Sequence, residues 1–287
     1  MSRRQPARHQ SETTTDTLET PPQPTADTQS ESAPAQDQAT LCGPDSATDP
    51  TISVVIPTLN EQEGIAICIE AVLSAFRELG VPGEIVVADS STDATPDIAR
   101  SYGAVVTEPE RNGYGAAYLD GFATARGDII AMGDADTTYD FTELPKLVSR
   151  MHETNADLVI GSRLDGQILP GSMPTLHQYI GNPLLTKMLN SLFGSDFSDT
   201  HSGFRVFTQE ALAEMDPSTT GMEFASEMLI GAARAELHVE EIPITYHPRV
   251  GEAKLESFKD GWRHVRYMLK EARGTTSVIG SLVSAFR

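Results

Sequence analysis

Beyond residue 51 the chain alternates short apolar runs with stretches of helical periodicity, and this alternation limits the folds open to it. The helical stretches lie near residues 61–79, 94–102, 115–125 and 142–153. Nearly continuous apolar strands that alternate with helices predict an α/β fold, with a mostly parallel, Rossmann-like sheet and helices on both faces. In such folds ligands bind beyond the carboxyl ends of the strands. The apolar runs are Ile52–Ile56, Ile85–Ala88, Ala104–Val106, Ile129–Met132 and Leu158–Ile160.

The first 50 residues differ in composition from the rest. They contain no Val, Ile, Phe, Tyr or Trp and are rich in Thr, Pro, Gln, Asp and Ser, so they cannot bury enough apolar surface to offset the entropy of ordering. We therefore predict a disordered acidic and polar tail over residues 1–50, one α/β domain over residues 51–273 and a short C-terminal tail over residues 274–287.

The chain is strongly acidic. It has 41 Asp and Glu residues against 21 Lys and Arg residues, and only five of the basic residues are Lys, so the formal net charge is −20. This balance argues against a nucleic-acid partner, which needs a basic surface. An acidic, lysine-poor composition is typical of halophiles and is then a property of the source. The two cysteines, Cys42 and Cys68, fit neither a disulfide framework nor a zinc cluster.

Two carboxylates follow the fourth apolar run. Asp134 and Asp136 are two residues apart, so both can turn toward one hard cation that carries substrate phosphates, and we expect Mg²⁺ or Mn²⁺. The alternative is a solvated acidic turn. Polar residues also follow the first two runs, as Pro57-Thr-Leu-Asn60-Glu61 and Asp89-Ser-Ser-Thr-Asp93.

These motifs, in their order along the chain, resemble those of glycosyltransferase family 2, the inverting enzymes of GT-A fold. The resemblance covers residues 52 to about 270. Further motifs resemble the branch of dolichyl-phosphate mannose and glucose synthases. Besides those already named, the motifs are Asn112-Gly113-Tyr114-Gly115, Gly161-Ser-Arg163, Gly181-Asn-Pro183, Ser198-Asp199-Thr-His201-Ser-Gly-Phe-Arg205, Glu223-Phe-Ala-Ser-Glu227 and Arg249-Val-Gly-Glu-Ala-Lys254.

The resemblance implies roles on the donor side. Asp89 would meet the nucleoside base, and Asp134 and Asp136 would hold the metal on the donor diphosphate. Two positions depart from the pattern of many relatives: Tyr114, where Lys is common, and Thr138, where some mannose synthases have Gln. The full set of implied donor-binding residues is Pro57, Asn60, Glu61, Asp89, Gly113 and Asp134.

On the acceptor side the chain needs cations that dock a phosphate. Arg supplies a planar fork and Lys a point charge. Asp199 is a candidate base or an acceptor-positioning group, and a phosphate monoester is largely dianionic at neutral pH, so a strong base is not required. Asp199, Asp136 and Arg163 are the predicted catalytic residues. The predicted phosphate ligands are Arg163, Arg205, Arg249 and Lys254.

Three other features leave structural and functional interpretations open. Glu227 falls in a helical stretch over residues 223–236 and is either a core-edge carboxylate or a site residue. Residues 176–193 predict a helix interrupted at Gly181-Asn-Pro183 whose apolar stripe faces a core or a lipid surface. Residues 246–273 carry seven basic and four acidic residues around Trp262, which is typical of an interfacial helix or of a solvated face.

Neither a signal peptide nor a stretch of 18 apolar residues is present, so we expect peripheral attachment at the cytoplasmic face of a membrane. The resulting hypothesis is a metal-dependent transferase that moves a hexose from UDP-glucose or GDP-mannose to polyprenyl or dolichyl phosphate, for glycan or protein glycosylation. The alternatives are a family 2 transferase with a sugar hydroxyl as acceptor, and a sugar-nucleotide nucleotidyltransferase.

Overall fold

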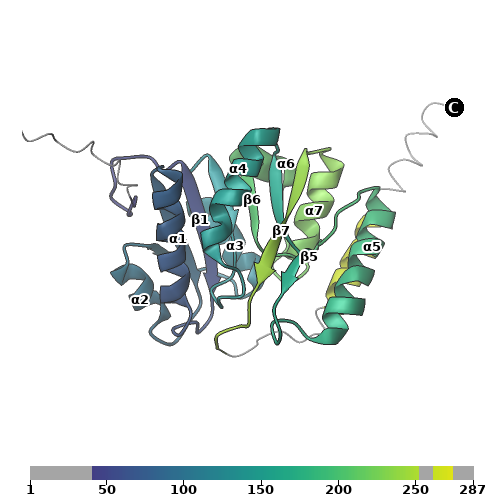
Figure 1. Cartoon of the computed structure of the whole chain (residues 1–287), viewed down its shortest axis with the longest axis horizontal. Helices are drawn as coiled ribbons and strands as arrows, with labels where there is room; N and C mark the ends of the chain where they lie inside the picture. The colour runs from purple at the N-terminus through teal and green to yellow at the C-terminus, as the bar shows by residue number, and fades with distance from the viewer. Residues whose placement is uncertain (1–40, 252–260, 274–287) are drawn as a thin grey trace, which may run out of the picture. The chain divides into compact units, whose positions relative to one another are not determined.

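The computed structural model describes residues 41–251 and 261–273. Its central element is a seven-stranded sheet with the strand order β3-β2-β1-β4-β6-β5-β7 (Figure 1). The pairs β1–β2, β1–β4, β2–β3 and β5–β7 are parallel, whereas β6 is antiparallel to both β4 and β5. The strands are β1 (Ile52–Thr58), β2 (Gly83–Asp89), β3 (Val105–Thr107), β4 (Ile129–Met132), β5 (Leu158–Ile168), β6 (Arg205–Thr208) and β7 (Val239–Tyr246).

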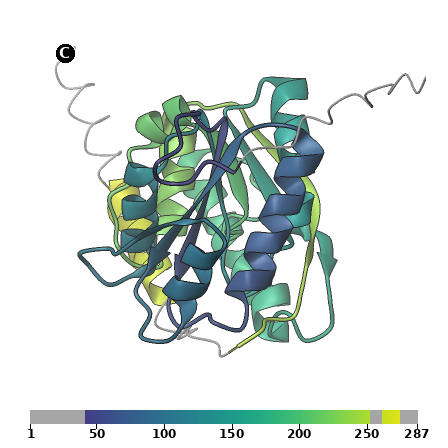
Figure 2. The same ribbon diagram turned by 90° about the vertical axis from the view of Figure 1, so that its left-hand side faces the viewer.

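Helices cover both faces of the sheet (Figures 1 and 2). One apolar cluster joins the sheet to α1, α2 and α4, and a second joins it to α3, α5, α6 and α7. The predicted α/β fold is confirmed. The helices are α1 (Ile65–Leu79), α2 (Thr95–Ser101), α3 (Tyr114–Thr124), α4 (Leu144–Thr154), α5 (Asn182–Phe193), α6 (Gln209–Met215) and α7 (Phe224–Arg234), with the short helices η1 (Phe141–Glu143) and η2 (His177–Gly181) and a helix over residues 261–273.

The helix predicted over residues 176–193 continues through the expected interruption. η2 is a π-helical turn that leads directly into α5, so the chain changes helix type at Gly181 and does not leave the helix. Asn182 is the first residue of α5 and does not cap it; its side-chain amide donates to the sulfur of Met173 at 3.4 Å. Among the described helices none is long and apolar enough to cross a membrane.

The segment just before β1, assigned to the tail from its composition, packs against the domain. Leu41 forms a parallel bridge with Gly83, and the Cys42 amide donates to the Gly83 carbonyl at 2.8 Å. Cys42 is fully buried. The packed part of the chain therefore starts by Leu41, ten residues before the boundary that composition indicates.

Candidate active site

One edge of the sheet collects the predicted site residues. The carboxyl ends of β1, β2 and β4 meet there, at the lower edge in Figure 1, where the arrowheads of β5 and β7 also point. Because β6 is antiparallel, its first residue, Arg205, pairs with Met132 at the end of β4. The loop that precedes β6, residues 198–204, therefore reaches the same edge as Asp134 and Asp136. We call this edge the rim.

Asp134 and Asp136 each receive hydrogen bonds from the residues around them. Asp136 Oδ1 accepts from the Thr138 amide at 3.0 Å and from the Thr138 hydroxyl at 2.6 Å. Asp134 Oδ1 accepts from the Tyr118 hydroxyl at 3.4 Å, and the Tyr114 ring packs edge-on against Tyr118 at 5.0 Å. Burial and the neighbouring Asp136 carboxylate raise the pKa of Asp134 above its ordinary value. The two departures from the family pattern, Tyr114 and Thr138, thus both support this carboxylate pair.

A segment from the C-terminal end of the sheet lies beside the carboxylate pair. The backbone of residues 246–250 is joined to residues 136–139 by two hydrogen bonds of 2.9 Å and by a bridge between Tyr139 and Tyr246. This pairing brings Arg249 to Asp136, and the guanidinium forms an ion pair with Asp136 Oδ2. The Arg249 side chain is 24% exposed, so it faces both the carboxylate and solvent.

Arg163 and Asp199 form a second, more buried ion pair. Arg163 Nε and Nη2 donate to the two carboxylate oxygens of Asp199 at 2.7 and 2.8 Å, and the Arg163 amide donates to Oδ2 at 3.1 Å. Asp199 is 0% exposed and Arg163 6%. Burial acts to raise the pKa of Asp199, but the charge and hydrogen bonds of Arg163 outweigh it and lower the pKa. A carboxylate held in this way is a weak base, so the geometry favours a positioning role for Asp199.

Two further groups fix this pair at the rim. The guanidinium of Arg163 lies over the Tyr246 ring, 5.3 Å from its centre. The Glu241 carboxylate, on β7, accepts from the Ser198 amide at 2.7 Å and from the Asp199 amide at 3.3 Å. The Asp199 turn is therefore tied to β7 as well as to β5.

Arg205 does not have the predicted place among the phosphate ligands. Its side chain is fully buried and donates to the carbonyl oxygens of Ser202, Thr200 and Ala225 at 2.9 to 3.1 Å. Arg205 therefore holds the loop before β6 together and is not exposed to an acceptor. The motif residues 198–205 correctly indicated the rim, but the side chain at their end turns inward.

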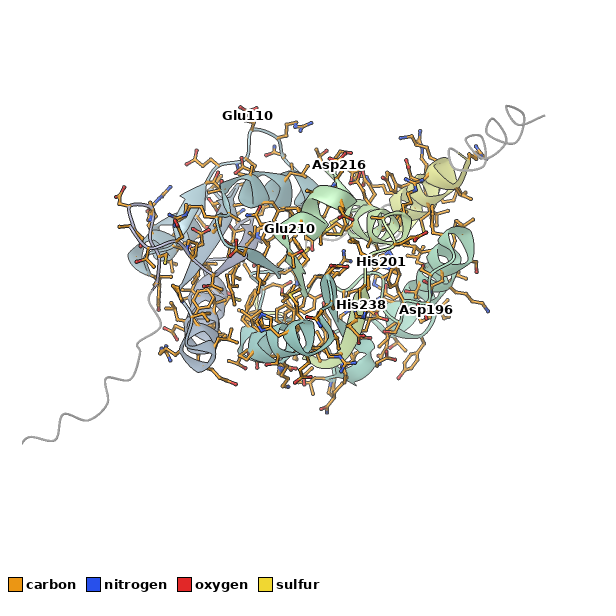
Figure 3. The ribbon with its side chains drawn as sticks, turned by 90° about the horizontal axis from the view of Figure 1, so that it is seen from above. Glu110, Asp196, His201, Glu210, Asp216 and His238 are labelled. Carbon is orange, nitrogen blue, oxygen red and sulfur yellow. The ribbon has the colours of Figure 1, made fainter. Side chains whose placement is uncertain are left out.

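His201 lies inside the domain, whereas Glu110 lies at its periphery (Figure 3). The His201 ring packs edge-on against the ring of His264, with the ring centres 4.5 Å apart. The Ser226 hydroxyl lies between them, 3.4 Å from His201 Nε2 and 2.8 Å from His264 Nδ1. Burial, His264 and nearby arginines lower the pKa of His201 well below its usual range. A neutral, internally bonded imidazole favours a structural role for His201.

The residues predicted to hold the nucleoside lie together at the ends of β1 and β2. Asp89 Oδ1 accepts from the hydroxyls of Thr58 at 2.6 Å and Ser91 at 2.5 Å, and the Ser91 hydroxyl receives the Asn60 amide at 2.7 Å. Asp89 is 5% exposed, so besides its expected contact with the nucleoside base it supports the loop that follows β2. These residues are Pro57, Asn60, Glu61 and Asp89.

The last two predicted residues have different outcomes. Gly113 directly precedes α3 and takes φ 140°, a conformation that favours glycine. Its turn lies at the rim, because the Tyr114 hydroxyl and Asp134 Oδ2 lie 3.1 and 3.3 Å from a Cβ placed on Gly203. Lys254 lies outside the described residues.

The carboxylate pair fits a divalent cation whose coordination is completed by substrate phosphates and water. Within residues 41–251 and 261–273, no cluster of three or more His, Cys, Asp or Glu side chains could hold a metal alone. Mg²⁺ and related ions are commonly bound through one or two carboxylates together with substrate phosphates and water. Asp136 Oδ2 pairs with the Arg249 guanidinium, which shows that a positively charged group can reach this oxygen.

Sequence reasoning missed Tyr118, Glu241 and Tyr246. Tyr118 is four residues after Tyr114, so both lie on one face of α3, which was a usable signal. Glu241 and Tyr246 follow from the position of β7 beside β5, and no local pattern indicated that pairing.

The chain belongs to glycosyltransferase family 2. The model of this family, Glycosyl transferase family 2, matches residues 53–216. Among curated proteins, the low-salt glycan biosynthesis hexosyltransferase Agl6 of Haloferax volcanii is 60% identical over 82% of this chain and 57% of Agl6, so the matched region spans little more than half of that protein. A dolichyl-phosphate hexose transferase of the same organism is 32% identical over 73% of this chain and 89% of its own length.

A solved structure supports the same assignment. Glucosyl-3-phosphoglycerate synthase from Mycobacterium tuberculosis, in complex with Mn²⁺, UDP and glucosyl-3-phosphoglycerate, superposes with a TM-score of 0.62 at 25% identity, over 78% of this chain and 80% of that chain. The GT-A fold predicted from the motifs is thereby confirmed. Membership of a glycosyltransferase family disfavours the nucleotidyltransferase alternative.

Proposed function

We propose that the protein transfers a hexose, with inversion, from a nucleotide sugar such as UDP-glucose or GDP-mannose to a polyprenyl or dolichyl phosphate. The observation that carries this proposal is the rim itself, where the carboxylate pair Asp134 and Asp136 lies at the same edge of the sheet as the ion pairs of Arg163 and Arg249. The names of the relatives support it, since one is a glycan biosynthesis hexosyltransferase and another a dolichyl-phosphate hexose transferase.

On the donor side, the loops after β1 and β2 would hold the nucleoside and the Gly113 turn would face the diphosphate. Asp134 and Asp136 would hold Mg²⁺ or Mn²⁺, which neutralises charge on the departing nucleoside diphosphate as a Lewis acid. The Mn²⁺ and UDP in the mycobacterial synthase are consistent with this assignment.

On the acceptor side, Arg249 and Arg163 would bind the phosphate. A phosphate acceptor is anionic before it binds, so it needs cations more than it needs a base. This requirement matches a site where Asp199 is engaged by Arg163 and the Arg249 guanidinium is partly open to solvent. A sugar hydroxyl acceptor, in contrast, would need Asp199 to be free as a base.

A lipid-bound acceptor requires access from a membrane surface. Large apolar side chains are exposed on and next to η2 and α5 and on the helix over residues 261–273. The helix over residues 261–273 also carries Arg263, Arg266 and Lys270. Trp262 is 66% exposed. Apolar and basic side chains on neighbouring helices favour peripheral binding to an anionic bilayer, and we propose the cytoplasmic face. The exposed apolar residues are Leu176, Tyr179, Ile180, Leu184, Leu192, Trp262 and Leu269.

The decisive experiment offers the protein a panel of UDP- and GDP-hexoses with Mg²⁺ or Mn²⁺ and a short polyprenyl phosphate, and measures the glycolipid formed. The matched control is the corresponding polyprenol, which lacks the phosphate. We expect transfer to the phosphate only, and its loss with a chelator. Transfer to a free sugar and not to the polyprenyl phosphate would contradict the proposal.

A further inference from the structure

Glu227 on α7 is a heavily hydrogen-bonded carboxylate that lies behind the rim. It accepts from the Ser218 hydroxyl at 2.9 Å, from the Thr219 amide at 2.7 Å and hydroxyl at 2.5 Å, and from the Tyr267 hydroxyl at 3.1 Å. The side chain is 7% exposed. An ionised carboxylate has acceptor sites for four such donors. Glu227 therefore ties together α7, the loop before it and the helix over residues 261–273.

The loop that Glu227 holds, residues 216–221, packs directly against the Gly113 turn. The Ala116 amide donates to the Thr220 carbonyl at 3.2 Å. A Cβ on Gly113 would lie 2.1 Å from the same carbonyl oxygen, and a Cβ on Gly115 would lie 2.2 Å from that of Thr219. Such distances leave no space for a side chain, so the two backbones fit together only with glycine at both positions. The position of this loop thus sets the position of the turn.

The Gly113 turn supports the residues on the donor side of the rim. Its Tyr114 packs against Tyr118, which donates to Asp134, and the Phe224 ring at the start of α7 stacks on Tyr118 at 5.6 Å. The turn also starts the 11-residue helix α3, whose dipole favours an anionic group near its amino end, although the Ala116 amide is already engaged by Thr220. A shift of the turn would move both the α3 amino end and the support of Asp134.

We propose that Glu227 is a positioning residue for the nucleotide diphosphate, which it serves by holding residues 216–221 against the Gly113 turn. This inference rests on the proposed function, because it assumes that the donor diphosphate lies at that turn. Glutamine has nearly the same shape but accepts through one oxygen only and directs its NH₂ group at donors. Glu227→Gln should therefore loosen the loop without leaving a cavity.

The test compares Glu227→Gln with Glu214→Gln, which makes the same charge change at an exposed residue of α6. Calorimetry would measure the Kd of UDP and of GDP with Mn²⁺, and steady-state kinetics would measure the KM of donor and acceptor. We expect Glu227→Gln to raise the nucleotide Kd and the donor KM about tenfold, the effect of a lost charged hydrogen bond, with an unchanged acceptor KM. Glu214→Gln should match the wild type.

A merely structural role would have a different signature. In that case Glu227→Gln would lower the melting temperature but keep the wild-type nucleotide Kd, and this result would overturn the inference. If Glu227→Gln does not fold, Thr219→Val removes one hydroxyl donor at nearly constant volume and should raise the Kd about threefold; an unchanged Kd would count against the inference. If the wild-type protein binds neither nucleotide, the proposed function fails and this inference fails with it.

Discussion

The two arginine–aspartate pairs of the rim have the same chemistry, but their arginines differ in accessibility. Arg163 and Asp199 are both buried and joined by two side-chain hydrogen bonds, whereas Arg249 forms an ion pair with Asp136 and is partly open to solvent. A buried pair becomes costly when one partner is lost, and an exposed charge is available to a ligand. The difference favours a mainly structural role for the Arg163 pair, whereas the guanidinium of the Arg249 pair is the one that solvent can reach.

The largest effect that separates the pairs is on stability. Asp199→Asn leaves the Arg163 guanidinium buried without its counter-charge, and we expect a loss of about 3–5 kcal/mol in the free energy of unfolding, measured by denaturant titration. Asp165→Asn, an exposed change two residues from Arg163, is the control. A loss below about 1 kcal/mol would show that the pair is not the structural element described here.

The next effect is on catalysis. Asp136→Asn removes charge from the carboxylate pair, and we expect turnover to fall at least about 100-fold, with little change in stability because the Thr138 bonds to Oδ1 can persist. A chelator should reproduce the loss in the wild type. Asp128→Asn, exposed at the opposite end of β4, should leave turnover unchanged. Near-normal turnover of Asp136→Asn with the same metal dependence would contradict the metal assignment.

A third effect should appear on acidification at the Asp199 side. Burial, Arg205 and Arg263 lower the pKa of His264 to about 4. An unfolded histidine, with a pKa of about 6.5, binds the proton more tightly than His264 does in the folded protein. The contribution of neutral His264 to the free energy of unfolding is therefore complete above pH 6.5 and is lost as the pH falls toward 4. The loss in the free energy of unfolding should reach about 3 kcal/mol in the wild type. It should be smaller in His264→Asn and equal to the wild-type loss in the control His152→Asn, which changes an exposed residue of α4. Equal slopes in all three proteins would refute it.

The smallest effect concerns the acceptor. Arg249→Ala should raise the KM of the polyprenyl phosphate about 10- to 100-fold, the cost of a lost charged hydrogen bond of about 1.5–3 kcal/mol, while donor hydrolysis is nearly spared. Arg77→Ala, on the exposed face of α1, is the control. If the acceptor were instead a sugar hydroxyl, Arg249→Ala would be mild and a folded Asp199→Asn protein would be nearly inactive.

The regular half of the molecule could be predicted closely. β1, β2, β3 and β4, with the helices between them, lie within a few residues of the expected ranges, because each strand is a continuous apolar run and each helix has its own periodicity. The same local logic located the rim residues Asp89, Asp134 and Asp136, since they directly follow strands. β6 and β7 were not predicted, because each is defined by pairing with a distant strand.

The pairing of side chains was decided only by the tertiary structure. The sequence by itself determined that a GT-A sheet forms and that carboxylates and arginines gather at its carboxyl rim. It could not show that Arg205 turns inward to three carbonyl oxygens, that Arg163 is engaged by Asp199, or that Arg249 meets Asp136. These contacts join residues that lie far apart in the chain or depend on a buried backbone turn. Their partners are therefore set by the antiparallel course of β6 and by the position of β7, which no local pattern specifies.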